Sequence, residues 1–367
     1  MLFLHNDVIA QVLDMKDVIQ VSEEAFAGLL DGDSVDRPRT YVYVPSTDSD
    51  TFYRWGSMEG ANRKMGVFAI RAKSDMVHWP VDENGNKTEE KYCTRPGLYC
   101  GLILLFSTVD GEPLAIINDG ILQHMRVGSG GGLGAKYLSR EDSHVVGMIG
   151  SGGMARSYLE AFCAVRDISQ VRVYSPTKAH REGFAEEMSE LLSLDVEPVD
   201  DARTAVRGAD IVSACTDAFQ TVVKGEWLEP GMFVTEVSGR ELDDVAYERC
   251  DVVARMAGQV DPSAMGPDVA WGNGSFAFRA GTEDEKARLP DSRPLARSTA
   301  PYPTITDLLS GRVGRTSRDQ ITMYVNSGMG NHGLQFAAVG WLAYEQAKKR
   351  GLGRELPTEW FLQDIRY

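Results

Sequence analysis

The sequence of 367 residues lacks the patterns that mark disulfide-rich, metal-binding and membrane proteins. Its five cysteines are scattered and odd in number, without a C-x-x-C spacing or a nearby histidine pair. We therefore expect reduced thiols, no metal site and a cytoplasmic location. No run approaches the roughly 18 apolar residues that a membrane span needs, and the N-terminus lacks the basic start and apolar core of a signal peptide.

Positive charge is also scarce. The sequence has 38 Lys and Arg residues against 53 Asp and Glu residues, a formal net charge of -15. This balance argues against nonspecific nucleic-acid binding and against docking on anionic lipid, so we expect neither as a partner. The length favours two domains, and the apolar and charged fractions are those of an ordinary globular protein.

The sequence does contain a glycine fingerprint directly after a short apolar run, residues 145–149. Gly150 would make a tight turn, Gly152 would let the backbone approach a pyrophosphate, and Ala155 would let the following helix pack closely. Such turns also occur without a ligand, so the fingerprint alone is weak evidence. The residues expected to bind a dinucleotide here are Gly150, Ser151, Gly152, Gly153, Met154 and Ala155.

The surrounding pattern strengthens this interpretation. Helical segments alternate with strand-like runs at 170–174, 209–216 and 232–237, which is typical of an open parallel sheet. The first part of the chain predicts a mixed or antiparallel sheet with a helix, from runs at 37–45, 67–73, 101–106 and 113–118. An amphipathic helix over 331–350 would return to that first domain, which is then discontinuous.

Residues 122–138 have a helical pattern but contain the run Gly128-Ser129-Gly130-Gly131-Gly132. Such a run costs a helix something like 3 to 4 kcal/mol relative to alanine. A loop and a tightly packed helix are both open for this segment.

The end of the second strand of the parallel sheet bears on the cofactor. NAD enzymes usually place an Asp or Glu there to bind the ribose 2′-hydroxyl, but here Tyr174 is followed by Ser175, Thr177 and Arg181. Hydroxyls and a cation would suit a 2′-phosphate, so we expect NADP(H), with NAD(H) as the alternative. The competing interpretation is an ordinary helix start at Ser-Pro.

Residues 119–128 resemble the DG-x-x-L-T-x-x-R-T block of the ornithine cyclodeaminase/μ-crystallin family. The resemblance continues in order through 135–140, 150–155, 209–212, 241–243, 314–316 and 320–322. It implies a Rossmann-type doubly wound parallel sheet inserted into a smaller α+β substrate and dimerisation domain. The expected division is 1–125 plus 322–367 for the α+β domain and 126–321 for the Rossmann-like domain, with a homodimer as the assembly.

The resemblance also implies chemistry: hydride transfer between a nicotinamide and the Cα–N bond of an α-amino or α-imino acid. It assigns Arg39 and Arg126 to the substrate carboxylate, and Lys73 as the active-site lysine that also contacts substrate. Arg71, on the same face of the same strand, is the rival for the catalytic position. The competing interpretations are a surface arginine for Arg39 and a surface ion pair with Asp75 for Lys73.

Further cofactor contacts are expected from residues at strand ends. Thr216 would lie near the nicotinamide ribose, Val237 and Ser238 would offer backbone groups, and Met329 lies in a segment that approaches the nicotinamide in the family. Arg126 is expected to contact the cofactor as well. His332 could donate a proton, although a plain position at the start of a helix is the favoured interpretation.

One departure from the family pattern affects the reaction. Ornithine cyclodeaminase has a catalytic aspartate where this sequence has Arg240, within Val237-Ser238-Gly239-Arg240-Glu241. We therefore expect an NADP(H)-dependent oxidoreductase, either an imine or ketimine reductase or an amino-acid dehydrogenase. The alternatives are a redox-neutral cyclodeaminase with bound NAD and a non-catalytic NADPH-dependent binding protein for small molecules.

Overall fold

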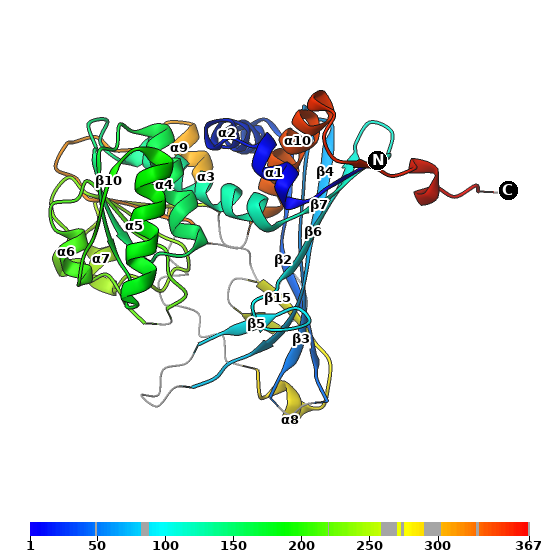
Figure 1. Ribbon diagram of the computed structural model, residues 1–367, viewed down its shortest axis with the longest axis horizontal. Coiled ribbons are helices and arrows are strands. Elements are labelled where there is room, and N and C mark those ends of the chain that lie inside the picture. The colour runs from blue at the N-terminus through cyan, green and yellow to red at the C-terminus, as the bar shows by residue number, and fades with distance from the viewer. Residues whose placement is uncertain are drawn as a thin grey trace.

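Two β-sheets, joined by one long helix, organise the computed structural model (Figure 1). The structure describes residues 1–47, 50–81, 88–218, 220–257, 270–272, 275–289, 302–327 and 330–365. Within these residues, none of the helices has the length and apolar character needed to cross a membrane.

The first sheet is a ten-stranded mixed sheet in the order β14-β15-β2-β3-β4-β6-β7-β1-β17, with β5 paired to β4. Its long central strands pair antiparallel, as the sequence predicts. Its strands are β1 (Leu2–Leu4), β2 (Ser34–Pro45), β3 (Phe52–Asn62), β4 (Val67–His78), β5 (Glu90–Tyr92), β6 (Cys100–Ser107), β7 (Pro113–Asn118), β14 (Ala270–Gly272), β15 (Ser275–Arg279) and β17 (Arg354–Glu355).

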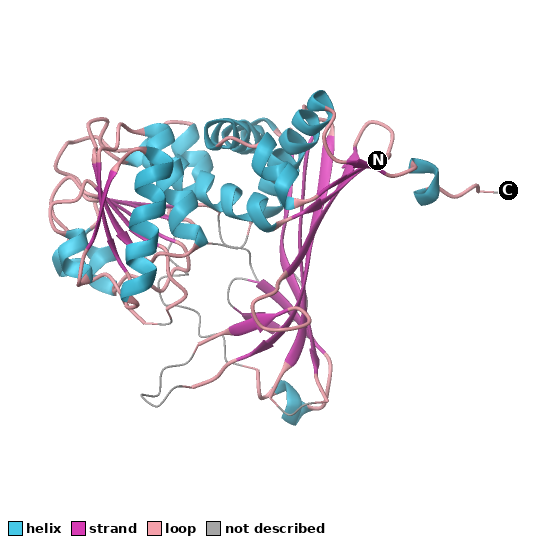
Figure 2. Cartoon of the chain, in the orientation of Figure 1, coloured by secondary structure: helices cyan, strands magenta, loops and turns pink. Residues whose placement is uncertain are grey.

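Helices α1 (Asn6–Val12), α2 (Met15–Asp31) and α10 (His332–Arg350) cover one face of this sheet (Figure 2). Side chains alternate along each strand, so Val67 and Ala69 point into the core beneath these helices while Phe68 and Ile70 point the other way. Asp36 on β2 accepts backbone N–H bonds from Asn331 (2.6 Å) and Leu334 (3.0 Å), which holds the start of α10 on the sheet.

The second sheet has seven strands, all parallel, in the order β10-β9-β8-β11-β12-β16-β13. Helices lie on both of its faces (Figure 1), which confirms the expected Rossmann-type sheet. Its strands are β8 (Val145–Ile149), β9 (Gln170–Tyr174), β10 (Asp195–Pro198), β11 (Ile211–Ala214), β12 (Phe233–Glu236), β13 (Val252–Arg255) and β16 (Thr322–Val325). The accompanying helices are α4 (Gly153–Val165), α5 (Lys178–Leu192), α6 (Ala202–Val206), α7 (Asp244–Arg249) and α9 (Ile305–Leu309).

The glycine run lies inside a helix, α3 (Gly120–Leu138). This helix joins the two lobes of the molecule, which are the parts built on the first and on the second sheet. A Cβ at Gly128 would lie 2.5 Å from the Ser157 carbonyl oxygen, and one at Gly131 would lie 2.3 Å from the Tyr158 ring. Both partners belong to α4, so the glycines allow two helices to approach more closely than side chains would permit. The packed-helix interpretation is therefore correct and the loop interpretation is wrong.

The sheet membership corrects the expected division of the chain at two places. Residues 322–325 form β16, which lies between β12 and β13 in the parallel sheet and is buried along its whole length. Residues 270–279 were expected in the Rossmann-like part, but β15 pairs in parallel with β2 at the edge of the first sheet. The short helices α8 (Glu283–Lys286), Gly225–Trp227 and Thr358–Phe361 complete the described elements.

Candidate active site

The glycine turn after β8 has the geometry that a dinucleotide requires. Gly150 has φ +107°, and its N–H donates to the Tyr174 carbonyl at 2.8 Å. A Cβ at Gly150 would lie 2.2 Å from the Cys215 carbonyl oxygen, so only glycine fits there. At Gly152 a Cβ would meet no atom within 4 Å, and this residue starts α4 without a side-chain cap. The helix start therefore offers backbone N–H groups to open space, which suits a pyrophosphate.

The rest of the fingerprint packs around this turn. Ala155 is fully buried against the sheet, as the close helix packing requires. Ser151 donates through its hydroxyl to the Ser175 hydroxyl at 3.0 Å, which joins the first turn to the end of β9. At Gly153 a Cβ would lie 2.8 Å from the imidazole of His124 on α3, so the dinucleotide turn directly contacts the connecting helix. Met154 packs at the border of the core.

The end of β9 differs from the sequence expectation in one respect. Arg181 is buried, donates to the Ser175 carbonyl at 3.1 Å and pairs with Asp200 at 2.5 Å. Its guanidinium therefore stabilises the turn between β9 and α5. Asp200, which follows the neighbouring strand β10, supplies a carboxylate that the sequence pattern does not predict. Thr177 precedes α5 and its side chain makes no cap bond to the helix.

Thr216, Val237 and Ser238 come together at the carboxyl ends of β11 and β12. Buried Glu241 accepts their backbone N–H groups at 2.7, 3.0 and 2.8 Å. Burial raises the pKa of Glu241 to about 7, although the Ser238 and Thr216 N–H bonds oppose that shift. Glu241 lies in one of the segments that resemble the family, but nothing in the sequence pattern predicts that it accepts these three N–H groups. Met329 lies outside the described residues.

Arg126 projects from α3 beside the first sheet and is 3% exposed. It contacts Gln123 Oε1 at 2.9 Å and His332 Nδ1 at 2.9 Å, and lies 4.7 Å from the Phe336 ring centroid. Arg71 lies 5.5 Å from the same ring and pairs with Asp119 at 2.5 Å. The arginine of the lobe-joining helix and the arginine of β4 therefore meet over one aromatic ring.

Positive charge in this cluster exceeds negative charge. Burial lowers the pKa of Arg126 well below its usual value, and the nearby positive charges of Arg39 and Arg71 lower it further, while Asp119 acts in the opposite direction. Arg39 Nε is buried and has no hydrogen-bond partner among the described residues. A ligand carboxylate would offset this charge and accept the available N–H groups.

Lys73 lies on the same face of β4 as Arg71, as strand alternation predicts. Its ammonium pairs with Asp75 at 2.5 Å, with side chains only 12% and 4% exposed, so this is not a surface pair. Arg54 also contacts Asp75, at 3.1 Å, and Glu89, at 3.0 Å. Burial lowers the pKa of Lys73 to about 8, which makes it able to exchange protons near neutral pH.

The two lobes meet at this cluster. Asn326, at the carboxyl end of β16, donates to the Val127 carbonyl of α3 at 2.8 Å and to the Tyr158 hydroxyl at 2.5 Å. The carboxyl end of the parallel sheet therefore adjoins the helix turn that carries Arg126. Sequence reasoning missed several members of the cluster, because a single polar residue in or next to a strand or helix gives no local signal of what it contacts: Tyr41, Arg54, Glu89, Asp119 and Gln335.

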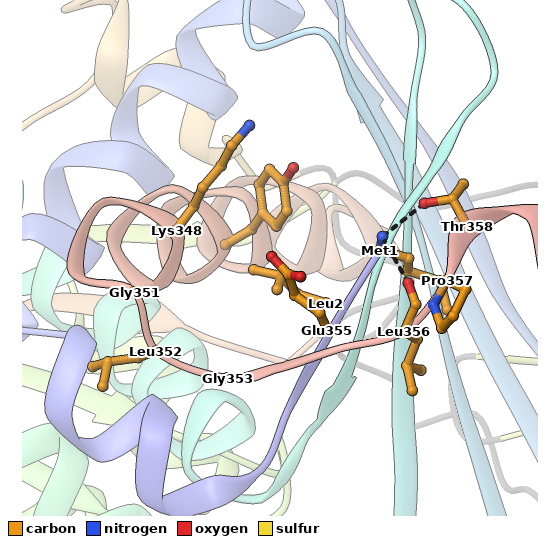
Figure 3. Close-up of a pocket in the computed structure, with 11 residues that line it drawn as sticks. Met1, Leu2, Lys348, Gly351, Leu352, Gly353, Glu355, Leu356, Pro357 and Thr358 are labelled. Carbon is orange, nitrogen blue, oxygen red and sulfur yellow. Dashed lines mark hydrogen bonds between the residues drawn. The ribbon is translucent and has the colours of Figure 1, made fainter.

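A pocket elsewhere in the molecule is unrelated to this cluster. It lies between the C-terminal end of α10, the first strand and the chain beyond Gly351, and is lined by residues such as Leu2, Lys348 and Leu352 (Figure 3). The Met1 ammonium holds the C-terminal segment next to this pocket, because it donates a hydrogen bond to Thr358 Oγ1 at 2.8 Å. Lys348 is sixteen residues from His332 on α10, or about 24 Å along a helix. We therefore place the candidate active site at the arginine cluster.

Comparisons with known proteins identify the family of this chain. The profile of the ornithine cyclodeaminase/mu-crystallin family matches residues 2–351. An uncharacterized cyclodeaminase, y4tK, from Sinorhizobium fredii (strain NBRC 101917 / NGR234) is 30% identical over 347 residues and 92% of each chain is covered. Among the described residues, no group of three or more His, Cys, Asp or Glu side chains is arranged to hold a metal ion.

Two solved structures share the fold. One is the Thermococcus litoralis delta(1)-pyrroline-2-carboxylate reductase in complex with NADH and L-proline, with 26% identity, a TM-score of 0.74, and coverage of 97% of this chain and 100% of that chain. The other is an archaeal alanine dehydrogenase dimer with bound NAD, with 22% identity, a TM-score of 0.73, and coverage of 97% and 99%. The chain therefore belongs to the ornithine cyclodeaminase/mu-crystallin family, as an NAD(P)-dependent oxidoreductase acting on carbon–nitrogen bonds.

Proposed function

We propose that this protein is an imine reductase that uses NADP(H) to reduce the Cα=N bond of an α-imino acid. The observation that carries the proposal is the excess of positive charge from Arg39 and the buried Arg71 and Arg126, beside a lysine with a lowered pKa. The arginines suit a substrate carboxylate, and Lys73 suits the proton on nitrogen. The Thermococcus litoralis reductase, which binds NADH and L-proline, supports the same substrate class.

The roles of the side chains follow from their positions. Arg39 and Arg126 would bind the carboxylate and so fix the orientation of the adjacent Cα–N bond. Arg71, paired with Asp119, would contribute charge without being free to move. Lys73 would give a proton to the imine nitrogen, and a bound nicotinamide would supply the hydride for Cα. In the reverse direction, amino-acid oxidation, Lys73 would accept the proton.

The preference for NADP(H) is part of the proposal. Two features support it: the absence of an acidic residue directly after β9, and the Ser175 and Thr177 hydroxyls at the start of α5. Arg181 contributes by holding this turn, since its guanidinium already binds Ser175 and Asp200. A titration of tryptophan fluorescence with NADPH and with NADH tests the preference. Tighter binding of NADH would overturn it.

Substrate tests separate the proposed function from its alternatives. The protein is incubated with NADPH and a panel of cyclic imino acids, or imines formed from keto acids and amines, and NADPH oxidation is followed. Formation of proline from ornithine without net cofactor oxidation would instead identify a cyclodeaminase. Tight NADPH binding without turnover of any imine would favour a binding protein.

We also propose a homodimer formed through the uncovered face of the first sheet. Trp55, Leu102 and Phe278 are 38–40% exposed on the face opposite α2 and α10. Phe68 and Phe106 extend this apolar surface, with ring centroids 6.5 Å apart. Large exposed apolar patches of this kind mark association surfaces.

A cytoplasmic location is also part of the proposal. It is supported by the five cysteines, which are unpaired in the structure, as is usual in a reducing compartment.

A further inference from the structure

A buried tyrosine, Tyr41, lies beside Lys73 and has no role in the reaction proposed above. Tyr41 on β2 is aligned with Gly56 on β3, which in turn is aligned with Lys73 on β4. A Cβ at Gly56 would lie 2.6 Å from the Tyr41 ring and 3.1 Å from Lys73 Cγ. Because Gly56 has no side chain, the side chains of Tyr41 and Lys73 can approach each other above it.

Three cations surround Tyr41. Arg39 donates to its phenol oxygen at 3.2 Å, and the Arg54 guanidinium and Lys73 Nζ lie 5.3 and 5.6 Å from its ring centroid. The phenol proton has no acceptor among the residues that the structure describes. This arrangement stabilises a phenolate more than a phenol. The charged and titratable groups that face Tyr41 are Arg39 and Tyr43 on β2, Arg54 on β3, Lys73 and Asp75 on β4, and Glu89 just before β5.

The proton affinities of Tyr41 and Lys73 are close to each other. Burial raises the pKa of Tyr41, but the charges of Arg39, Lys73 and Arg54 outweigh burial and lower it to about 7. Burial lowers the pKa of Lys73 to about 8, and the charge of Tyr41 acts against that shift. A proton can pass between groups of matched pKa at little cost in free energy.

We infer that Tyr41 is a positioning residue for Lys73: its phenol oxygen, held by Arg39, keeps the lysine charged and returns a proton to it in each turnover. This inference rests on the proposed function. The Lys73 ammonium loses a proton to the imine nitrogen as Cα receives the hydride. The Tyr41 phenolate then takes a proton from water and passes it to the Lys73 amine, which restores the phenolate and the ammonium, so that each turnover consumes one hydride and one proton.

The test compares Tyr41→Phe with Tyr43→Phe in the full-length protein. Tyr43 lies two residues along the same strand, with its ring 5.9 Å from that of Tyr41, so it is a matched control for loss of a hydroxyl. Reduction of a cyclic imino acid by NADPH is measured as a function of pH. We expect Tyr41→Phe to lower kcat about tenfold and to move the fall of activity at alkaline pH about one pH unit lower, because Lys73 loses the neighbouring negative charge.

A second measurement does not need turnover. The ultraviolet absorbance of tyrosinate is titrated in the wild-type protein, Tyr41→Phe and Lys73→Met. We expect one tyrosine to ionise near neutral pH in the wild type. This transition should be missing in Tyr41→Phe and should occur at higher pH in Lys73→Met. Lys73→Met also replaces Tyr41→Phe as the test if the latter does not fold.

The outcomes separate the two proposals. An unchanged pH profile in Tyr41→Phe, or a wild-type titration without a near-neutral tyrosine, overturns the role of Tyr41 even if imino acids are reduced. If the wild type reduces no imino acid, the proposed function fails. The tyrosinate titration then still decides whether Tyr41 and Lys73 interact, and a shift of equal size in Tyr43→Phe would also count against Tyr41.

Discussion

At the scale of single residues, the candidate site is a balance of buried charges. Arg54 is neutralised by Asp75 and Glu89, and Arg71 by Asp119. Arg39 and Arg126 have no carboxylate of the described chain within ion-pairing distance. Since a charge held away from water without a counterion is costly, a bound anion would stabilise these two side chains. Carboxylate binding is therefore the property on which single-residue predictions concentrate.

Arg39→Lys should weaken substrate binding. Lysine cannot offer the two parallel N–H groups of a guanidinium, and loss of one charge-assisted hydrogen bond costs about 1.5–3 kcal/mol, roughly a 10- to 100-fold increase in KM. The control is Arg37→Lys on the same strand, where the side chain is exposed and paired with Glu59. Steady-state kinetics with an imino acid, together with an NADPH titration that stays unchanged in both variants, checks this. An effect of equal size in the control would refute it.

Imine reduction should slow as the pH rises through about 8. In the proposed reaction the Lys73 ammonium is the proton donor. Burial lowers its pKa to about 8, so the protonated fraction is complete well below that pH and is lost above it. We expect kcat to be level at mildly acidic pH and to fall up to tenfold per pH unit at alkaline pH. Lys73→Met should abolish most of the activity at every pH while NADPH still binds. A rate that keeps rising above pH 8 would exclude this role for Lys73.

At the scale of elements, α3 connects the nucleotide turn with the arginine cluster. Its glycines are buried against α4 and β16: a Cβ at Gly134 would lie 2.6 Å from the Tyr324 ring. The low helix propensity of the run is compensated by this close packing. The same helix places Arg126 over Phe336 and passes beside Gly153.

Gly131→Ala should destabilise the protein even though alanine is the better helix former. The new methyl would meet the Tyr158 ring at 2.3 Å, and such overpacking costs typically about 1–3 kcal/mol. Gly183→Ala is the matched control: it lies on the exposed side of α5, where a Cβ meets nothing within 4 Å, so it should stabilise by up to about 1 kcal/mol. Urea unfolding of both variants measures the difference. A stabilised Gly131→Ala would mean that α3 and α4 are less tightly packed.

Elements were predicted well where their cause is local. Hydrophobic periodicity located α10 and four strands of the parallel sheet, β8, β9, β11 and β12, since each carries its own pattern. Residues 128–132 remained undecided because the reason for a glycine there is Ser157, Tyr158 or Ala161 on another helix. The site shows the same limit: Arg71 and Lys73 could be placed on one face from alternation alone, whereas the contacts of Tyr41 depend on strand pairing.

At the scale of the whole molecule, the chain crosses between its two sheets more often than the sequence suggests. β16 returns to the parallel sheet immediately before α10 covers the other sheet, and β15 leaves the nucleotide part to pair with β2. A buried four-residue strand and an edge pairing carry no signal of which sheet they join. Simple boundaries in the sequence therefore could not describe the division between lobes.

The uncovered sheet face should be the dimer interface. Leu102→Lys combined with Trp55→Glu would place charges in its centre, and we expect the dimer to dissociate, as measured by sedimentation velocity. Val109→Lys is the control, since Val109 is 85% exposed at the turn between β6 and β7. A wild-type protein that is monomeric at all accessible concentrations, or a dimer that survives the double substitution, would contradict this surface assignment.

The contact between Gly153 and His124 has an energetic consequence for the two ligands. The turn that would receive the pyrophosphate touches α3 only two residues before Arg126, the residue that would receive the substrate carboxylate. If the bound dinucleotide increases the affinity for substrate by some factor, the bound substrate must increase the affinity for the dinucleotide by the same factor. The helix shared by the two sites would thus couple their occupancies, and a positive coupling would favour the complex with both ligands over either complex with one.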